Sequence, residues 1–153
     1  MDGRWRIRAA LPADAAEIAD AEARCFTDPW SRAGLEELFE NRLSFGLVAE
    51  AFQGGLAGYL FARVIVDEAE ILNLAVIPEY RTEGLGGRLL DGAVQTLWER
   101  GARSVFLEVR DSNHVARALY EGRGFRLVGV RADYYRAPRE QALVYRLARA
   151  ESE

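Results

Sequence analysis

The chain has 153 residues, half of them hydrophobic, and a formal net charge of -4. This length suits one domain with a buried core, and the negative charge argues against a broad nucleic-acid-binding surface, which needs a basic face. No apolar run approaches the ~20 residues of a membrane-spanning helix, so we expect a soluble protein with no membrane partner.

Two features indicate where the protein works. Residues 1–8 are charged and lack the apolar core of a signal peptide, and the lone Cys25 cannot form an internal disulfide. Both predict a cytoplasmic protein. All 20 basic residues are arginine, so the only amine that the chain itself offers for acylation is its N-terminus.

Alternating and periodic apolar residues predict the elements of the first half of the chain. These are a strand over residues 4–9, a helix after Pro12, a short helix after an N-cap at Ser31, and strands over residues 45–52 and 56–66 with a turn at Gly54 and Gly55. Cys25 is expected on the buried face of the first helix. As a nucleophile it would need an activating partner, and the single His114 is far away in sequence.

Two features of this half have both a structural and a functional interpretation. Trp30, between the two helices, either fills the core or forms a wall of a binding groove. The carboxylates of Asp67, Glu68 and Glu70 form either a solvated turn or a surface that attracts a cationic substrate. The residues alone leave these alternatives open.

The central part of the chain predicts a strand, a glycine-rich turn and a helix. An apolar run over residues 71–77 ends at Pro78, and Gly84, Gly86 and Gly87 follow. Apolar residues then recur at helical spacing, at Leu85, Leu89, Ala93 and Leu97. The first N–H groups and the dipole of such a helix suit a phosphate, although a tight turn without a ligand is the alternative. Neither the Walker A loop nor G-x-G-x-x-G fits, which disfavours a nucleotide kinase or a Rossmann enzyme.

The second half of the chain predicts two helices and three strands. The first helix ends near Gly101, a strand covers residues 104–109, a helix capped by residues 111–113 ends at Gly124, and strands cover residues 125–130 and 141–147. A loop that holds Arg131, Tyr134, Tyr135 and Pro138 is expected to join the last two strands.

Glu108 is a candidate functional residue. Val105, Leu107 and Val109 alternate with Phe106, which predicts a central strand covered on both sides. A carboxylate at the carboxyl end of such a strand is costly unless it is paired or used, and this end is where α/β sheets bind ligands. An ion pair with an arginine such as Arg110 is the alternative. No cluster has metal-ligand spacing, so no metal is expected.

Seven segments in order resemble the RimI-type ribosomal-protein-alanine N-acetyltransferases of the Gcn5-related N-acetyltransferase (GNAT) superfamily. They are Cys25-Phe-x-x-Pro-Trp-Ser31, Ile71-Leu-Asn-Leu-Ala-Val76, Tyr80 with the loop Arg81-Thr-Glu-Gly84-Leu-Gly86, Leu107-Glu-Val-Arg-x-Ser-Asn113, Ala118-Leu-Tyr120, Gly124-Phe125 and Arg131-x-x-Tyr-Tyr135. The resemblance implies an α/β (α+β) GNAT fold, in which a mixed, mostly antiparallel sheet splays at the acyl-CoA site and about four helices flank it. Residues 1–149 would form this single domain and residues 150–153 a short tail.

The resemblance also implies roles for individual residues, with acetyl-CoA as cosubstrate. Glu108 matches the general base and Tyr120 the general acid, which suits a reaction in which an amine loses a proton and a thiolate gains one. A buried aromatic on a helix face is the alternative for Tyr120. The residues that would hold coenzyme A are Leu74, Ala75 and Val76 at the acetyl-pantetheine arm, Arg81, Thr82, Glu83, Gly84, Leu85, Gly86 and Gly87 at the pyrophosphate, and Asn113.

The implied acceptor is the N-terminal alanine of a small-subunit ribosomal protein, within a basic segment. Residues that could hold such a peptide are Trp30, Asn73, Tyr134 and Tyr135 with the acidic Glu68 and Glu70. An α-amine titrates at about 8 and a lysine at about 10.4, so neutralising a lysine at pH 7 costs about 3 kcal/mol more, which favours the α-amine. Other protein N-termini, lysines, a small amine, or a non-catalytic acyl-CoA sensor are the alternatives. We expect a monomer or weak dimer without a nucleic-acid partner.

Three positions depart from the family pattern. Thr82 and Gly87 occupy positions where the family often has glycine and a basic residue, so one cationic contact to phosphate could be missing. Gln141 replaces an aspartate, which could alter the second half of the acceptor loop.

Overall fold

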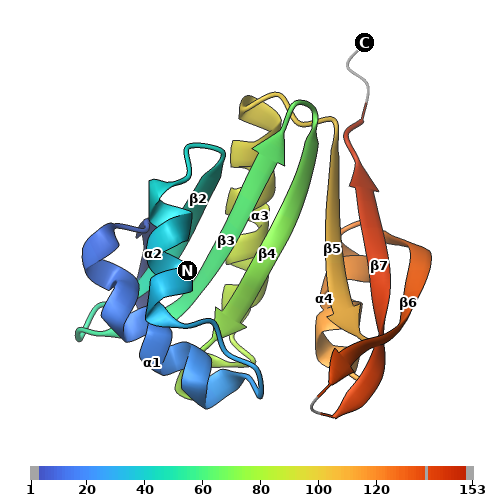
Figure 1. Cartoon of the computed structure of the whole chain (residues 1–153). Coiled ribbons are helices and arrows are strands. Elements are labelled where there is room, and N and C mark those ends of the chain that lie inside the picture. The colour runs from blue at the N-terminus through green and yellow to red at the C-terminus, as the bar shows by residue number, and fades with distance from the viewer. Residues whose placement is uncertain (1–3, 137, 151–153) are drawn as a thin grey trace.

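The computed structural model describes residues 4–136 and 138–150, so residues 151–153 of the expected tail lie outside the described part. Figure 1 shows the helices and strands, to which two short 3-10 helices, η1 and η2, are added. In chain order the elements are β1 (Trp5–Ala9), η1 (Pro12–Asp14), α1 (Ala15–Cys25), α2 (Arg32–Glu40), β2 (Ser44–Ala51), β3 (Leu56–Ile65), β4 (Glu68–Val76), η2 (Pro78–Tyr80), α3 (Leu85–Glu99), β5 (Ser104–Arg110), α4 (His114–Gly122), β6 (Arg126–Arg136) and β7 (Arg139–Ala148).

The described strands form one seven-stranded sheet in the order β1-β2-β3-β4-β5-β7-β6. Every neighbouring pair is antiparallel except β4 and β5, which are parallel. The expected mixed, mostly antiparallel α/β (α+β) fold is therefore confirmed.

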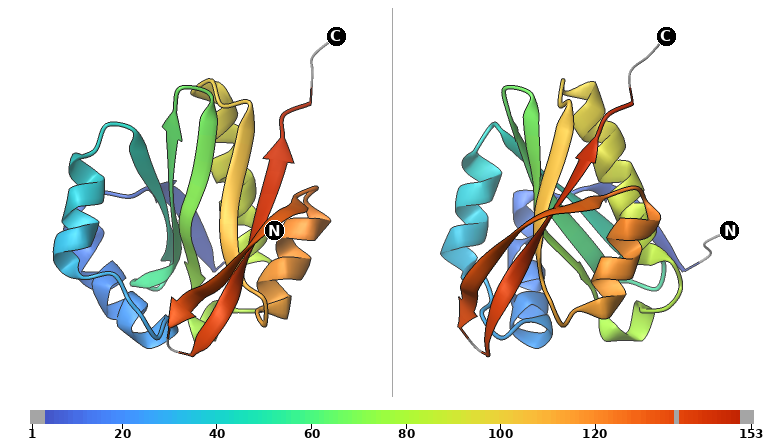
Figure 2. Two further views of the ribbon diagram at one scale, coloured as in Figure 1. Left: turned by 45° about the vertical axis from the view of Figure 1, so that its right-hand side comes forward. Right: turned by 90° about the vertical axis from the view of Figure 1, so that its right-hand side faces the viewer.

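Helices lie on both faces of the sheet. α1 and α2 lie over β2 and β3 on one face, whereas α3 and α4 lie on the other face (Figure 1, Figure 2). The side chains that recur along α3 are all buried, as their spacing predicts; they are Leu85, Leu89, Ala93 and Leu97. They pack α3 onto β3 and β4 and so fix the N-terminus of α3 beside the carboxyl end of β4.

Glu68 and Glu70 lie in a strand, which corrects the expectation that they form a turn. They begin β4 and pair with Ile65 and Arg63 of β3. The turn is shorter than expected and includes Val66, whose φ is 60°. Cross-strand pairing overrides the low β-propensity of these acidic residues.

Arg131, Tyr134 and Tyr135 lie on β6, which corrects the expectation that they belong to a loop. β6 pairs with β7 as far as Arg136, across a register shift between Arg131 and Tyr135. Asp133, inside this irregular stretch, has a φ of 52°. Because an irregularity of this kind re-aims side chains, the strand can direct residues on both sides of Asp133 towards the sheet face.

Only one face of β5 is covered by a helix, so the expectation of a strand covered on both sides is wrong for the other face. Val105, Leu107 and Val109 are buried, whereas Phe106 and Glu108 are half-buried. No described helix crosses β5 on the face that carries α1 and α2 (Figure 1).

The sheet separates between β4 and β5. The two strands pair only where Glu68, Ala69 and Glu70 meet residues 104–106. Beyond that point each strand stays paired with its outer neighbour alone, β3 or β7. A wedge-shaped opening therefore lies between the carboxyl-terminal parts of β4 and β5.

A β-bulge in β4 borders this opening. Phe61 pairs with Asn73 and Ala62 with Ile71, so Leu72 is an extra residue in β4. A bulge bends its strand and increases the local twist. Both effects help β4 to diverge from β5.

Gly58 of β3 allows α3 to pack closely. A Cβ at this position would lie 2.9 Å from the carbonyl oxygen of Ala75, and 3.2 Å and 3.3 Å from methyl carbons of Leu89 and Leu85. We predict that Gly58→Ala lowers the free energy of unfolding by roughly 1–3 kcal/mol, as overpacking does. Urea denaturation measures this change.

Gly129→Ala is the matched control, because a Cβ there would meet nothing closer than the Cβ of Val144 at 3.9 Å. If Gly58→Ala and Gly129→Ala had the same free energy of unfolding, the prediction that a Cβ at position 58 overpacks the contact with α3 would be wrong.

Candidate active site

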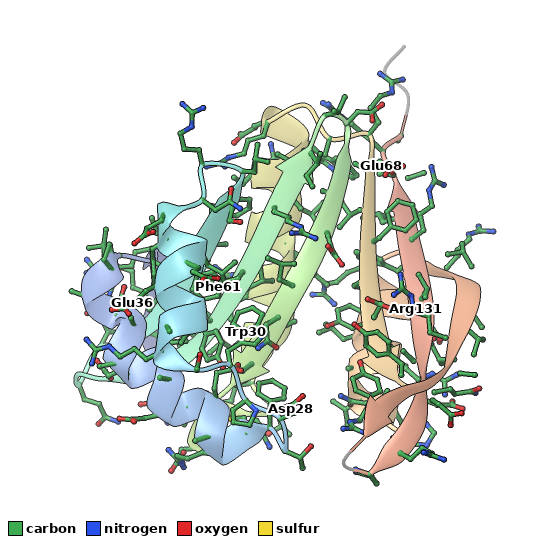
Figure 3. The ribbon with its side chains drawn as sticks, viewed as in Figure 1. Asp28, Trp30, Glu36, Phe61, Glu68 and Arg131 are labelled. Atoms are coloured by element: carbon green, nitrogen blue, oxygen red, sulfur yellow. The ribbon has the colours of Figure 1, made fainter. Side chains whose placement is uncertain are left out.

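A pocket of about 750 Å³ occupies the opening between β4 and β5. Figure 3 shows Trp30 and Arg131 on opposite sides of this opening, with Glu68 near its upper end. Nine residues singled out from the sequence line the pocket: Trp30, Glu70, Asn73, Leu74, Glu108, Asn113, Tyr120, Tyr134 and Tyr135. Glu68 instead lines a second, smaller hollow with Arg63 and Phe106.

Glu108 presents a buried carboxylate oxygen at the pocket. Its Oε2 atom lies 2.8 Å from Nε of Arg131, as an ion pair. No described residue donates a hydrogen bond of good geometry to this oxygen. The ion pair is therefore with Arg131, and Arg110 pairs with Glu140 at 3.4 Å. An oxygen that is buried at a pocket and has unused acceptor capacity suits a ligand N–H group or a water molecule.

Two tyrosines of β6 stand beside Glu108. The rings of Tyr134 and Tyr135 meet edge to face at 5.1 Å, and the guanidinium carbon of Arg110 lies 4.2 Å from the centroid of Tyr135. Burial raises the pKa of Tyr135 to about 12. Burial also raises the pKa of Tyr134, and the charge of Glu108 adds to this effect. Both phenols therefore stay neutral at physiological pH.

Tyr120 reaches the pocket from α4. It is 7% exposed and packs against Phe125 with the ring centroids 5.7 Å apart. Burial raises the pKa of its hydroxyl, so the proton stays bound over the whole physiological range. Tyr120 thus combines the two alternatives, because it packs in the core and also borders the pocket.

Trp30 likewise combines its two alternatives. Its ring packs edge to face on Phe61 with centroids 6.0 Å apart, and it also lines the pocket. Cys25, at the end of α1, lines the same wall, and its sulfur accepts a hydrogen bond from Nη2 of Arg81 at 3.7 Å.

Acidic side chains outnumber basic ones in the pocket lining. Four lining residues carry carboxylates, namely Glu22, Asp28, Glu70 and Glu108, and Arg110 is the one arginine among the described lining residues. The charge of Glu70 is partly balanced by Arg63, whose Nη2 lies 2.9 Å away. The pocket therefore favours a cationic ligand.

The glycine loop does not line the pocket but lies at the end of β4. Gly84 is the N-cap of α3 with a φ of 83°, and Thr82 has a φ of 65°. Arg81 donates from Nε to the carbonyl of Val76 at 2.9 Å, and Glu83 forms an ion pair with Arg4. These contacts fasten a turn whose free N–H groups belong to the first residues of α3, which is the arrangement that binds phosphates.

Arg123 lies against this turn from the end of α4. A Cβ on Gly87 would come within 2.1 Å of Nη2 of Arg123, so the guanidinium occupies the space beside the first turn of α3. Nε of Arg123 lies 3.0 Å from a carboxylate oxygen of Asp91. A cation is therefore present beside the loop although residue 87 itself is glycine.

Asn113 lines the pocket, whereas Gln141 lies outside its lining and contacts the turn that follows β5. The side-chain oxygen of Asn113 caps α4 by accepting from the N–H of Ala116 at 3.1 Å. Gln141 donates from Nε2 to a carboxylate oxygen of Asp111 at 2.7 Å. An aspartate at position 141 would face this carboxylate with a like charge, which gives the departure from the family pattern a physical reason.

Two residues of the site were not predicted from the sequence. Glu22 lines the pocket, and Arg123 lies beside Gly87 at the glycine loop. Glu22 is 1% exposed and lies four residues after the buried Ile18, on the face of α1 where an apolar residue is expected. That break in the apolar pattern is the one indication of Glu22 in the sequence. Nothing in the local sequence indicates Arg123, because its contact with Gly87 joins separate elements.

Within residues 4–136 and 138–150, no group of three or more His, Cys, Asp and Glu residues could hold a metal ion. Nor is any helix there long and apolar enough to cross a membrane.

Comparison with known proteins gives consistent matches over most of the chain. The model of the acetyltransferase (GNAT) family matches residues 15–125. A Bacillus subtilis (strain 168) protein, named provisionally as a ribosomal protein bS18-alanine N-acetyltransferase, is 41% identical over 86% of this chain and 87% of its own. The Escherichia coli (strain K12) ribosomal protein bS18-alanine N-acetyltransferase is 37% identical over 82% of this chain and 85% of its own. The crystal structure of the ribosomal-protein-S18-alanine N-acetyltransferase from Escherichia coli superposes with a TM-score of 0.88 at 30% identity, covering 97% of this chain and 96% of the other.

Proposed function

Because this chain belongs to the acetyltransferase (GNAT) family, we propose that it moves acetyl from acetyl-CoA to the N-terminal alanine of a small-subunit ribosomal protein. The observation that carries the proposal is the buried Glu108 oxygen, which borders a pocket between two parted strands. Relatives at 37% and 41% identity carry names that give ribosomal protein bS18 as the substrate. The same proposal includes that the chain acts on this ribosomal protein in the cytoplasm.

The described residues fit acetyl-CoA along one line. The N–H groups at the start of α3, with Gly84 in the left-handed region, would donate hydrogen bonds to the diphosphate. Arg123 beside Gly87 would add the cation that residue 87 does not supply. The acetyl-pantetheine arm would then lie along residues 74–76 of β4. The edge of this segment that faces β5 is not paired with a strand.

Glu108 and Tyr120 would carry the two proton transfers. The acceptor nitrogen attacks the thioester carbonyl, a C–N bond forms, and Glu108 takes a proton from the nitrogen directly or through a water. The C–S bond then breaks, and Tyr120, whose pKa is raised by burial, holds a proton for the leaving thiolate. Acetylated amine and free coenzyme A result.

The acceptor end of the pocket suits a cationic N-terminus. Carboxylates predominate in its lining, and Trp30, Tyr134 and Tyr135 provide flat apolar surface for the first side chains. An α-amine has a pKa of about 8, close to neutral pH, so it does not need the lysine-specific tunnel that a side-chain amine would need.

The first prediction concerns the acceptor. With acetyl-CoA, a basic peptide that begins with alanine should release coenzyme A, whereas the same peptide with a blocked α-amine should not, even when it contains lysine. Thiol release and the mass of the peptide measure this. Acetylation of lysine in the blocked peptide would favour a lysine acetyltransferase, and no turnover of any amine would favour an acyl-CoA sensor.

A second prediction concerns the two proton-transfer groups. Glu108→Gln should lower kcat by roughly 10²–10³-fold and Tyr120→Phe by at least about tenfold, which are typical costs of losing general acid–base catalysis. Because burial raises the pKa of Tyr120, its ionisation should not limit the rate below about pH 10. Steady-state pH profiles of the three proteins provide the measurement; equal rates would remove both residues from the mechanism.

A third prediction concerns Arg123. Arg123→Gln should raise the Kd of acetyl-CoA about 3–10-fold, the size of one partly exposed hydrogen bond, while kcat at saturation stays the same. Isothermal titration calorimetry measures the Kd. Arg126→Gln, which removes an equal charge from the exposed start of β6, should leave it unchanged. Equal effects of the two variants would mean that Arg123 does not contact a phosphate.

A further inference from the structure

Glu22 is a buried carboxylate that the proposed reaction does not use. It is 1% exposed, it lines the pocket, and no ion pair joins it to a described residue. Its Oε1 accepts from the backbone N–H of Trp30 at 2.9 Å. Its Oε2 accepts from the hydroxyl of Tyr59 and from the side-chain amide of Asn73. All three donors are neutral groups, so no described cation donates a hydrogen bond to this carboxylate.

These hydrogen bonds connect two sides of the pocket, at Trp30 and at Asn73, where we propose that the acceptor binds. Trp30 lies in the segment between α1 and α2, whereas Asn73 follows the bulged Leu72 in β4. The side-chain oxygen of Asn73 also accepts from the N–H of Leu74 at 3.0 Å. A continuous chain of hydrogen bonds therefore runs from the backbone of β4 through Asn73 and Glu22 to the backbone at Trp30.

A carboxylate is an expensive way to join these elements. Burying a charge without an opposite charge is unfavourable, and a well-packed apolar side chain often replaces a buried ionic group without loss of stability. The adjoining positions of α1 that face the core are apolar, namely Ile18 and Ala21. The carboxylate at position 22 therefore calls for a role that packing alone does not supply.

We propose that Glu22 is a positioning residue for the acceptor, a role that rests on the proposed function. It holds Trp30 and Asn73 at a fixed separation, so that the acceptor's first residue enters between the α1–α2 segment and the bulge of β4. Its uncompensated charge also favours the cationic amine at that end of the pocket. The phosphate loop follows Val76 of β4, and none of the hydrogen bonds of Glu22 joins it to that loop.

Polarity reversal tests this role. Glu22→Gln places an amide N–H₂ group among donors, so it should break the contact with Asn73 or with Trp30. The double variant Glu22→Gln, Asn73→Asp restores donor–acceptor matching and moves the charge by one side chain. Tyr59→Phe is the matched control, because it removes one donor to Glu22 from a buried residue that does not line the pocket.

We expect Glu22→Gln to raise the KM for the basic alanine-initiated peptide at least tenfold, with the Kd of acetyl-CoA within twofold of wild type. The double variant should recover the KM to within about threefold, and Tyr59→Phe should change neither value by more than twofold. If KM and Kd rose together with a fall in Tm, or if the double variant recovered Tm but not KM, Glu22 would be a structural residue only.

Hydrogen exchange at the Trp30 amide tests the positioning without any acceptor. Exchange should be faster in Glu22→Gln and return towards the wild-type rate in the double variant. Unchanged exchange would overturn the positioning role, whatever the acceptor is. Failure of the wild-type protein to acetylate the peptide would overturn the proposed function and leave the exchange result to decide on Glu22.

Discussion

The parting of β4 and β5 after three residue pairs is the constraint on which the rest of the structure depends. The strands are parallel and joined through α3, so their carboxyl ends point the same way, towards the N-terminus of a helix. β4 is drawn to β3 by pairing and twisted by its bulge at Leu72, while β5 is held by β7. Residues 68–70 of β4 pair with β3 and β5 at once, so the gap beyond them results from the divergence of the two strands and not from a lack of hydrogen-bonding groups. The pocket is thus a consequence of how the strands diverge.

Charge is distributed unevenly along this opening. The end beside α3 carries Arg81, Arg123 and the positive end of the helix dipole. The pocket itself is lined by the carboxylates of Glu22, Glu70 and Glu108. In the proposed reaction, an anionic diphosphate would therefore favour the start of α3 and a cationic amine the pocket. Tyr120 approaches the pocket from α4 and Glu108 from β5.

The sequence predicts well those elements whose own residues specify them. The apolar spacing of α3 and the polar caps at Ser31 and Asn113 correspond to helix positions and hydrogen bonds in the structure. The parts that could not be predicted depend on contacts across the chain. β6 has a polar sequence around Asp133 that resembles a loop, and pairing with β7 makes it a strand. Glu22 differs from a surface glutamate only through Trp30, Tyr59 and Asn73, which three other segments supply.

The ion pair between Glu108 and Arg131 joins a largely buried carboxylate to an exposed arginine. The side chain of Arg131 is 60% exposed and that of Glu108 is 17% exposed, so the arginine can leave at little cost while the carboxylate stays in place. In the absence of an acceptor, the pair places a cation beside Glu108. In the proposed reaction, the ammonium group of the acceptor would exchange with this exposed guanidinium. The carboxylate would therefore meet a cation in both states, and its Oε2, which accepts no hydrogen bond from a described residue, could accept one from a nitrogen or a water.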